Sequence, residues 1–351
     1  MERTAVDWLT ALDPNRWDRR VIVYDAPGPL SAALDKEEIP WASVRRKQGV
    51  DWHYAFRLGR VLRQWDVDVL HTHNDTALFY GALAVRIAHT SVMVATLHNV
   101  WPASAKLKWV LRRLSRGIGP VVAVCEDVRD RMEGDGWAGP GTVRVIKNGV
   151  DPGRVASGLS RDEVRAAEET PADAPVVGYV GRMDPNKNLS LLIEAFALVR
   201  ERIPEARLWL VGEGPDRAAL ERQAAAAGLH GAIHFCGLQG KPGDYYGAID
   251  VFAMSSLSEG MPMVILEALT HCLPVVAPGV GGIPEMLGDA GLCVPPGDPD
   301  ALAAAVTGLL ADPGSAKAMA AGGRERVLSE FTLENAASAY ESLYLEFLER
   351  G

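Results

Sequence analysis

The sequence predicts an α/β fold with two doubly wound, Rossmann-like domains that face a cleft. Short runs rich in β-branched residues alternate with longer helical patterns along almost the whole chain, as in βαβ units around a buried parallel sheet. The length of 351 residues suggests two domains at roughly 100–200 residues each. Residues 153–175, with few large apolar side chains, separate two series of such runs and are expected to form a linker.

The predicted elements follow in chain order. Expected strands before the linker are 21–24, 67–71, 92–97, 121–124 and 143–146; those after it are 176–180, 207–211, 233–235, 251–254, 274–277 and 291–294. Helical patterns such as 52–64, 188–202 and 217–227 lie between them. We therefore expect a first domain at 1–152, a second at 176–332, and a last helix at 333–351 that crosses back to the first domain.

Composition excludes several classes of protein. Hydrophobic residues make up 48% of the chain and charged residues 23%, which excludes disordered and collagen-like chains. No apolar run approaches the ~20 residues that span a bilayer, and the first residues lack the pattern of a signal peptide, so we expect a cytoplasmic chain. The four cysteines are too scattered for a disulfide framework or a zinc site.

Charge is distributed unevenly along the chain. The net charge is −9, but residues 1–152 hold 21 basic against 18 acidic residues, and the remainder carries −12. The positive first half predicts a surface for anionic partners. The chain as a whole is acidic and so is a poor binder of nucleic acid, and we expect no nucleic-acid partner.

The most informative motif is Ser258-Glu-Gly-Met-Pro-Met-Val-Ile-Leu-Glu, which ends at Glu267. A strand is expected to end shortly before it, and a helix to start near Pro262, whose first-turn N–H groups suit a diphosphate. Helical geometry brings Glu267 to within about 80° of Glu259 around the axis. Two carboxylates beside a phosphate site make sense if each accepts hydrogen bonds from sugar hydroxyls. The alternative is a solvated loop glutamate and an ordinary helix glutamate.

A second cluster follows the predicted strand 176–180. It reads Gly181-Arg-Met-Asp-Pro-Asn-Lys187-Asn and precedes an amphipathic helical pattern. Glycine lets backbone approach a ligand, and Arg182 and Lys187 at the carboxyl end of a strand can neutralise phosphate charge. The alternative is a pair of surface cations near Asp184.

With these motifs the sequence resembles the retaining glycosyltransferases of family 4, which have the GT-B fold. Val-Gly-Glu-Gly-Pro at 211–215 and Asn-Gly-Val-Asp at 148–151 resemble turns of that family. The resemblance implies that Glu259 binds hydroxyls of the donor sugar and Glu267 those of the ribose. Gly181, Arg182 and Lys187 would bind the diphosphate. The backbone near the helix start would meet the sugar and diphosphate at Gly260, Met261, Pro262, Met263 and Val264.

The acceptor side is expected in the first domain. His98, in Thr-Leu-His-Asn after a strand, matches the family's histidine that faces the cleft. His73 is a further candidate, and His71 a weaker one. A structural role for each of these histidines is the alternative. The expected catalytic residues are Glu259, His98, Arg182 and Lys187.

The resemblance implies glycosyl transfer from a nucleoside-diphosphate sugar, a UDP-sugar ahead of a GDP-sugar, to a hydroxyl of a glycan, lipid-linked or small-molecule acceptor. Cell-envelope polysaccharide is the expected context. No bound cofactor or metal is expected: Asp66-Val-Asp68 spells a metal-binding motif of another glycosyltransferase class, but it lies at the beginning of a strand, the wrong end for the cleft. A nucleotide-sugar epimerase and a non-catalytic sugar-nucleotide-binding subunit are the alternatives.

Residues 106–116 predict an amphipathic helix with a basic arc that contains Trp109. An indole among basic side chains on the positive half favours peripheral contact with anionic lipid on the cytoplasmic face of a membrane. A helix with a solvated basic face is the alternative.

The beginning of the chain departs from the family pattern. The family's first domain opens with a hydrophobic strand and a Gly-rich loop before its first helix, whereas here 4–12 reads as that helix directly after Met1. The run 21–24 would then be the second strand. In a doubly wound order the first strand is central, so its absence would leave a hydrophobic slot and unpaired backbone groups. This reading expects ~15–20 further residues ahead of Met1; a sheet that closes over the gap is the alternative.

Overall fold

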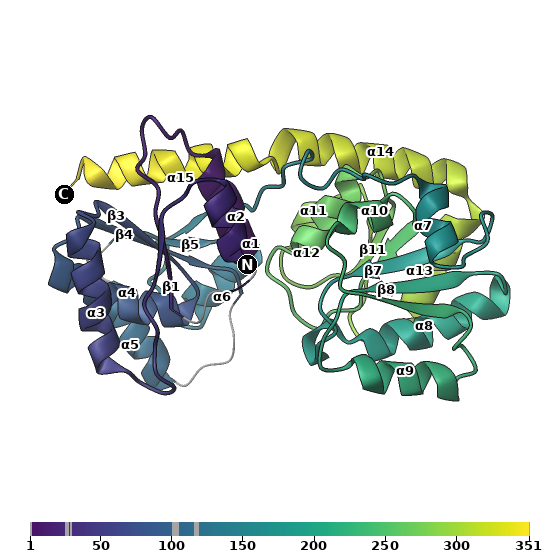
Figure 1. Cartoon of the computed structure of the whole chain (residues 1–351). Coiled ribbons are helices and arrows are strands. Elements are labelled where there is room, and N and C mark those ends of the chain that lie inside the picture. Colours follow the sequence, from purple (N-terminus) through teal and green to yellow (C-terminus); the bar gives the residue numbers. More distant parts are fainter. Residues whose placement is uncertain (1, 25–27, 29, 100–104, 116–118, 351) are drawn as a thin grey trace. The chain divides into compact units, whose positions relative to one another are not determined.

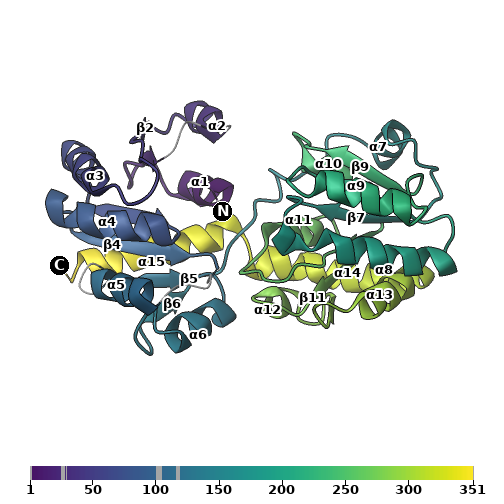
Figure 2. The ribbon, with the colours of Figure 1, turned by 90° about the horizontal axis from the view of Figure 1, so that it is seen from below.

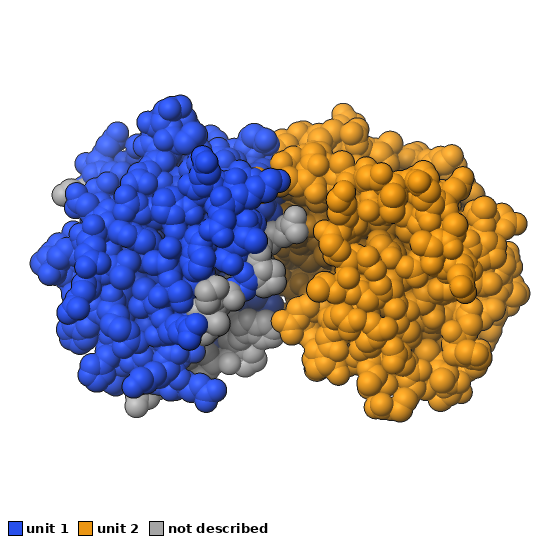
Figure 3. Space-filling model, viewed as in Figure 1, with its two compact units in different colours: residues 1–149, 333–351 blue, residues 150–332 orange. Residues whose placement is uncertain are grey.

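The computed structural model describes residues 2–24, 28, 30–99, 105–115 and 119–350. The chain forms two compact units, coloured separately in Figure 3: unit 1 comprises residues 1–149 and 333–351, and unit 2 comprises residues 150–332. Within the described residues, none of the helices combines the length and apolar character needed to cross a membrane.

Unit 2 is built on one six-stranded parallel sheet. Its strands are β7 (Val176–Val180), β8 (Arg207–Val211), β9 (Ile233–Gly237), β10 (Val251–Ala253), β11 (Val275–Pro278) and β12 (Leu292–Val294). They are ordered β12-β11-β10-β7-β8-β9, so the first strand of the unit is central, between the second and the fourth. This is the doubly wound order that the sequence predicts.

The helices of unit 2 cover both faces of this sheet. They are α7 (Arg161–Ala167), α8 (Leu189–Arg202), α9 (Arg217–Ala226), α10 (Pro242–Tyr246), α11 (Met263–Thr270), α12 (Ile283–Leu287), α13 (Pro299–Ala311) and α14 (Pro313–Glu330), with a 3₁₀ turn, η1, at Pro185–Lys187. Helices α8, α9 and α13 lie on one face, and α10, α11 and α14 on the other (Figures 1 and 2). All five residues of β7 are buried, which explains its uninterrupted apolar sequence.

The predicted linker, residues 153–175, is instead an integral part of unit 2. It contains α7, which Ser160 starts with a reciprocal capping box to Glu163. Arg165 is 1% exposed and donates hydrogen bonds to the carbonyls of Ala172, Ala174 and Ala248 at 2.7–3.0 Å. A buried arginine therefore anchors a stretch whose small side chains look like those of a linker.

Unit 1 contains two separate sheets. The first pairs β1 (Val21–Val23) with β2 (Trp41–Ser43), and the second has the order β3-β4-β5-β6, with β3 (Val69–His73), β4 (Val92–Leu97), β5 (Val121–Ala123) and β6 (Val143–Val145). Its helices are α1 (Glu2–Ala11), α2 (Leu30–Lys36), α3 (Trp52–Gln64), α4 (Asp75–Ala88), α5 (Ala105–Ser115), α6 (Glu126–Gly134) and α15 (Leu333–Leu348). Helices α1 and α15 cover one face of the larger sheet, and α3, α4 and α5 the other (Figure 1).

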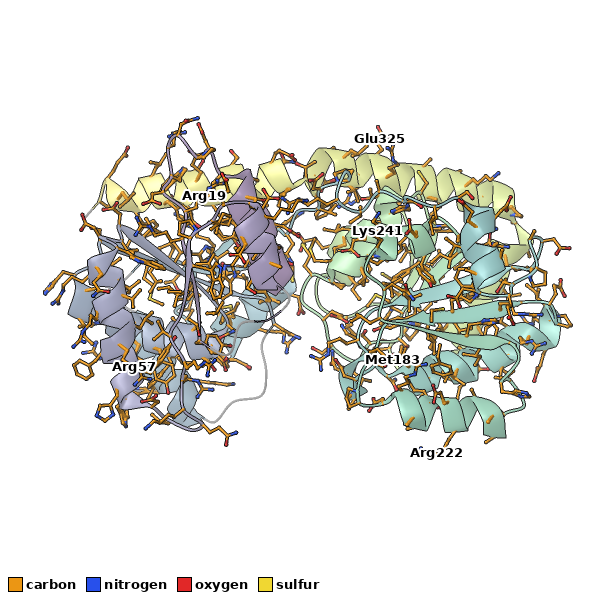
Figure 4. All side chains as sticks on the ribbon, in the orientation of Figure 1. Arg19, Arg57, Met183, Arg222, Lys241 and Glu325 are labelled. Atoms are coloured by element: carbon orange, nitrogen blue, oxygen red, sulfur yellow. The ribbon has the colours of Figure 1, made fainter. Side chains whose placement is uncertain are left out.

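The core of unit 1 lies between the larger sheet and helices α1 and α15. Trp8, Val94 and Tyr340 belong to one buried cluster that joins these three elements. Arg19, labelled in Figure 4, donates hydrogen bonds of 3.1–3.4 Å to the carbonyls of Leu9, Thr10 and Leu12 at the end of α1. The first and last described helices of the chain are thus fixed on the same sheet.

Two elements of unit 1 differ from the sequence predictions. β3 begins at Val69 rather than residue 67, because Asp66 has a φ of 51° and turns the chain just before it. β2 was not predicted, since Trp41–Ser43 has only three residues and none of them is β-branched. The predicted strand at 21–24 is present as β1, but it pairs with β2 alone among the described residues.

A cavity of about 950 Å³ lies between β1 and β3. Both strands line it along their whole length, α1 and α15 contribute side chains from one layer, and α3 and α4 from the other. The sheet of unit 1 therefore does not close over this position, and the slot expected from the sequence is open.

Candidate functional site

The loop after β7 holds the first group of candidate residues. Gly181 has a φ of 154°, and a Cβ there would lie 2.6 Å from the hydroxyl oxygen of Tyr179. That hydroxyl donates a hydrogen bond of 2.8 Å to the carbonyl of Arg182, and burial raises the pKa of Tyr179. Met183, labelled in Figure 4, is fully buried in the same loop. The strand's own tyrosine and a buried methionine thus hold this loop in place.

The loop after β8 packs on this loop, backbone against backbone. A Cβ at Gly212 would lie 1.9 Å from the carbonyl oxygen of Gly181, and one at Gly214 would lie 2.2 Å from that of Met183. The amide of Met183 donates to the carbonyl of Glu213 at 3.0 Å. The close contact between the two loops therefore explains why Gly212 and Gly214 are glycines. A dinucleotide ligand is not needed to explain them.

Lys187 ends the short 3₁₀ turn η1 in the loop after β7. The Asp184 carboxylate caps this turn by accepting from the amide of Asn186 at 3.1 Å. The Ser255 hydroxyl, which follows β10, lies 3.0 Å from the carbonyl oxygen of Lys187. Arg182 is different: its side chain is 75% exposed, and its Nε lies 3.6 Å from a carboxylate oxygen of Asp184.

The second group of candidates lies between β10 and α11. Glu259 and Gly260 are buried in this loop, and Pro262 is the N-cap residue of α11, one residue before the first helical position. The loop after β11 supports it: a Cβ at Gly281 would lie 1.9 Å from the carbonyl oxygen of Glu259, and the amide of Gly282 donates to that of Gly260 at 2.7 Å. The backbone before α11 is thus fixed by a neighbouring loop.

The structure brings Lys187 and Glu259 together. Lys187 Nζ lies 2.6 Å from Glu259 Oε1, with side chains that are 20% and 9% exposed. A second contact between the same loops joins the Asn186 side-chain amide to the carbonyl of Ser258 at 2.8 Å. Lys187 is therefore not a solvated surface lysine. Its ammonium group and the Glu259 carboxylate lie in one recess, where each neutralises the charge of the other.

Glu267 lies on α11, where its side chain is partly buried. The hydroxyl of Tyr246, on α10, donates to Glu267 Oε2 at 2.8 Å. Burial, together with the nearby carboxylate, raises the pKa of Tyr246 well above its usual value, so this hydroxyl remains a donor at neutral pH. The ring of His271 stacks on that of Tyr246 with centroids 5.5 Å apart. One oxygen of Glu267 is therefore held by a fixed partner.

Sequence reasoning missed Tyr179 and Tyr246. Tyr179 faces the loop that carries Arg182, and Tyr246 holds Glu267. A tyrosine within an apolar strand reads as core, and Tyr246 lies in a helix of five residues. The paired tyrosines at 245 and 246 were the one available signal, because a buried tyrosine needs a partner for its hydroxyl.

The candidate histidines lie in unit 1, at the carboxyl ends of β3 and β4. His73 Nδ1 and His98 Nε2 are 3.0 Å apart, with rings stacked at 5.3 Å. His71 lies 2.7 Å from both the Tyr344 hydroxyl and the Thr96 hydroxyl. Burial lowers the pKa of His73 to about 3 and holds those of His71 and His98 well below their usual range. All three are therefore neutral at pH 7.

The predicted amphipathic helix is α5, Ala105–Ser115. Trp109 is 66% exposed, whereas Leu111 is 1% exposed. Lys108 pairs with Asp135 at 3.0 Å, and Arg113 is exposed. Of the remaining predicted residues, the side chains of Lys106, Leu107 and Arg116 lie outside the described part of the structure.

Two family models match the chain. "Glycosyltransferase Family 4" matches residues 1–154, and "Glycosyl transferases group 1" matches residues 174–312. The two matches divide the chain near the border between the two units.

Three relatives illustrate the similarity in sequence. The D-inositol 3-phosphate glycosyltransferase of Saccharomonospora viridis is 31% identical over 93% of this chain and 80% of its own length. The GDP-mannose-dependent alpha-(1-6)-phosphatidylinositol monomannoside mannosyltransferase of Mycolicibacterium smegmatis is 30% identical over 79% and 76%. The lipopolysaccharide core biosynthesis glycosyltransferase LpsE of Rhizobium meliloti is 35% identical over 64% and 63%, so the match spans just under two thirds of LpsE.

Solved structures show the same fold. Anabaena Alr3699/HepE in complex with UDP has a TM-score of 0.86 and 22% identity, covering 98% of this chain and 96% of its own. A glycosyltransferase from Rickettsia africae has a TM-score of 0.88 and 20% identity, covering 100% and 95%. These likenesses confirm the predicted GT-B fold of two Rossmann-like domains.

Proposed function

Since the chain belongs to glycosyltransferase family 4, we propose that it transfers a glycosyl unit from a nucleoside-diphosphate sugar to an acceptor hydroxyl, with retention at the anomeric carbon. The observation that carries this proposal is the contact between Lys187 and Glu259 at 2.6 Å. A nucleotide sugar offers phosphate charge to the ammonium and hydroxyl donors to the carboxylate. One ligand can therefore satisfy both groups where at present they satisfy each other.

Donor binding on this account replaces the ion pair. The negative charge of the diphosphate then pairs with Lys187 and with the exposed Arg182. Glu259 then accepts hydrogen bonds from sugar hydroxyls, and Glu267, whose Oε2 accepts from Tyr246, accepts them from the ribose. The first turn of α11 adds backbone N–H groups and the positive end of a helix dipole. Residues 260–262 lead into that turn, and Met263 and Val264 are its first residues.

The transfer step needs little covalent participation by the protein. The bond between the anomeric carbon and the diphosphate oxygen breaks, the acceptor oxygen bonds to that carbon, and the departing diphosphate takes the hydroxyl proton. Lys187, Arg182 and the start of α11 stabilise the negative charge that develops on the diphosphate. This arrangement supports a metal-independent reaction, in which these groups replace a divalent cation. Activity that persists in EDTA would agree with it.

The names of the relatives guide the choice of substrates. The donors to test are UDP-sugars and GDP-sugars, because HepE forms a complex with UDP and one relative is a GDP-mannose-dependent mannosyltransferase. We place the UDP-sugar first. LpsE acts in lipopolysaccharide core biosynthesis, which favours a cell-envelope glycan or a lipid-linked acceptor. His98 and His73 are proposed for the acceptor side, where neutral imidazoles can accept a hydrogen bond from a hydroxyl.

Peripheral membrane contact at the cytoplasmic face is part of this proposal. Trp109 on α5 is 66% exposed beside the exposed Arg113. Helix α3 offers a second such surface, because Trp52 and Phe56 are 61% and 64% exposed and Arg60 is exposed next to them. Aromatic side chains among basic groups suit the interface of an anionic bilayer. Sedimentation with anionic liposomes, compared between the wild type and Trp109→Ala, tests this part alone.

Calorimetric titration with UDP, GDP and their sugar conjugates tests the donor site. Glu267→Ala and Arg182→Ala should each weaken nucleotide-sugar binding by about 1.5–3 kcal/mol, or ten- to a hundredfold. Glu259→Ala should reduce turnover and leave the affinity for the bare nucleoside diphosphate nearly unchanged. Glu201→Ala, an exposed glutamate at the end of α8, is the control. Loss of nucleoside-diphosphate binding in Glu259→Ala would contradict the assigned roles.

The same proteins separate the alternative activities. Transfer from the donor to an added acceptor supports the proposal. Interconversion of the donor sugar without an acceptor would instead indicate an epimerase. Tight donor binding without hydrolysis or transfer would indicate a sugar-nucleotide-binding subunit.

A further inference from the structure

Helices α10 and α11 lie side by side on one face of the sheet of unit 2 (Figure 1). His271 is the C-cap residue of α11, four positions after Glu267, so the two side chains lie on the same side of the helix. Both contact Tyr246, the last residue of α10. Glu267 Oε2 accepts a hydrogen bond of 2.8 Å from its hydroxyl, and the ring of His271 stacks on its ring with centroids 5.5 Å apart and an interplanar angle of 27°. Two residues of one helix thus hold the hydroxyl and the ring of the same tyrosine.

The imidazole of His271 is itself fixed by the backbone. Its Nε2 lies 2.6 Å from the carbonyl oxygen of Val155, and because a carbonyl only accepts, Nε2 carries the proton. Burial lowers the pKa of His271, so the ring is neutral at pH 7 and its one N–H is committed to Val155. The same carbonyl touches α10, since a Cβ at Gly243 would lie 2.1 Å from it. Val155 therefore holds the imidazole beside the helix that carries Tyr246.

Tyr246 depends on contacts outside its own helix. α10 has only five residues, too few to fix a side chain by helical hydrogen bonds alone. Its Asp244 accepts hydrogen bonds of 2.6 and 3.0 Å from the amides of residues 158 and 159, which anchors the helix. The side chain of Tyr246 is fully buried, and its ring contacts those of Phe252, at 5.9 Å, and His271. Of these two rings, that of His271 is held by a hydrogen bond to backbone, so it fixes the direction in which the tyrosine hydroxyl points.

We propose that His271 is a positioning residue for the ribose of the nucleotide-sugar donor, acting through Tyr246 on the carboxylate of Glu267. This role rests on the proposed function, in which Glu267 accepts hydrogen bonds from the ribose hydroxyls. Such bonds weaken steeply when the acceptor leaves the preferred distance and angle. A site that hydrogen-bonds hydroxyls also rejects an analogue that lacks them. His271 therefore contributes to the preference of the site for a ribonucleotide over a 2′,3′-dideoxyribonucleotide.

Calorimetric titration with UDP and 2′,3′-dideoxy-UDP tests this role, with the guanosine pair in their place if GDP binds the wild type more tightly. We expect His271→Ala to weaken UDP binding about three- to fivefold and to leave the affinity for the dideoxynucleotide unchanged. KM for the donor sugar should rise by the same factor, with kcat unchanged. His271→Gln keeps an N–H for Val155 but lacks the ring, so it should show the same loss even if the alanine variant unfolds. His234→Ala, at a partly buried histidine of β9, is the control and should change neither affinity.

A double substitution separates positioning from packing. Because His271 acts through the Tyr246 hydroxyl, His271→Ala should cause no further loss of UDP affinity in a Tyr246→Phe background, whatever it does to Tm. Losses that add in the double variant would overturn the proposal. An equal loss of affinity for UDP and dideoxy-UDP in His271→Ala would also overturn it, because it would assign His271 a general structural role.

Glu267→Ala separates this proposal from the proposed function. If Glu267→Ala abolishes the preference for the ribonucleotide and His271→Ala retains it in full, the positioning role alone is wrong. If the wild type lacks the preference, or Glu267→Ala keeps it, the assignment of Glu267 to the ribose is wrong and the positioning role is wrong as well.

Discussion

The two units share a doubly wound plan but differ at the centre of their sheets. In unit 2 the centre is β7, fully buried and paired on both edges, and the loop that leaves it carries Gly181 to Lys187. In unit 1 the same position is a cavity of about 950 Å³, and the strands around it remain partly exposed. The difference shows which elements hold each unit together. Unit 2 builds its candidate site on a complete sheet, whereas unit 1 relies on β4 and the helices α1 and α15.

The largest expected effect concerns the integrity of unit 2. Arg165→Met removes a buried cation that binds three carbonyls and the carboxylate of Asp250, and should lower the free energy of unfolding by about 3–5 kcal/mol. Arg161→Met is the matched control, because Arg161 is 40% exposed, binds the same carboxylate, and should cost under about 1 kcal/mol. Urea unfolding, read by hydrogen exchange in β7 and β4, measures both. A loss of under about 1 kcal/mol in both variants would mean that residues 153–175 are a dispensable linker.

The next effect concerns the loops at the carboxyl edge of the complete sheet. Gly281 has a φ of 59°, and a Cβ there would meet the carbonyl of Glu259 at 1.9 Å. Gly281→Ala should therefore introduce about 1–3 kcal/mol of strain and weaken UDP-sugar binding by roughly ten- to a hundredfold. Gly322→Ala in α14, where a Cβ meets nothing within 4 Å, should leave binding unchanged. Titration calorimetry of both variants decides whether the loop contact supports the donor site.

A pH effect is expected in unit 1, which holds three buried histidines. The pKa values of His71, His73 and His98 are lowered by burial, that of His73 to about 3, so the folded state resists protonation while the unfolded state takes up protons below about pH 6.5. Stability is thus full above pH 6.5 and is lost as the pH falls. One such histidine lowers the free energy of unfolding by about 2 kcal/mol between pH 7 and pH 5. Hydrogen exchange in β4 at both pH values checks this, and a pH-independent β4 would contradict it.

The smallest effect concerns the position of Glu267. Tyr246→Phe keeps the ring and removes the 2.8 Å hydrogen bond, which should cost about 1 kcal/mol and raise KM for the donor about fivefold with little change in kcat. Tyr245→Phe, in the same helix as Tyr246, is the matched control, since the Tyr245 hydroxyl donates to Glu168 at the end of α7 at 2.6 Å. Steady-state kinetics with the two variants separates positioning of Glu267 from general stability. A KM that rises equally in both would argue for stability alone.

Much of the fold could be predicted from the sequence, because buried parallel strands such as 176–180 and 92–97 are uninterrupted apolar runs. The alternation of strands and helices predicted a parallel sheet of βαβ units, which unit 2 forms. The role of residues 153–175 could not be predicted, since it depends on Arg165 binding the carbonyl of Ala248, 83 residues further along the chain, together with those of Ala172 and Ala174. The short strand β2 lacked a local signal, because its stability comes from pairing with β1.

The local structure around the candidate residues was predictable from the sequence, but their contacts were not. The spacing of Glu259, Pro262 and Glu267 pointed to a loop followed by a helix start, and that is what forms. The ion pair from Lys187 to Glu259 joins loops 72 residues apart, and no local pattern encodes it. The hydroxyl of Tyr246 is likewise brought to Glu267 by packing of two short helices. The partners of site residues that are distant in sequence could be identified only from the structure.

The most direct test of the account is hydrogen exchange of the whole chain with and without UDP, and in a parallel run GDP. The account predicts that the nucleotide that binds slows exchange in residues 181–188 and 258–266 of unit 2, and leaves β1 and β3 of unit 1 as they were. Binding with protection confined to unit 1, or with residues 181–188 and 258–266 unchanged, would contradict the assignment of the donor site to unit 2.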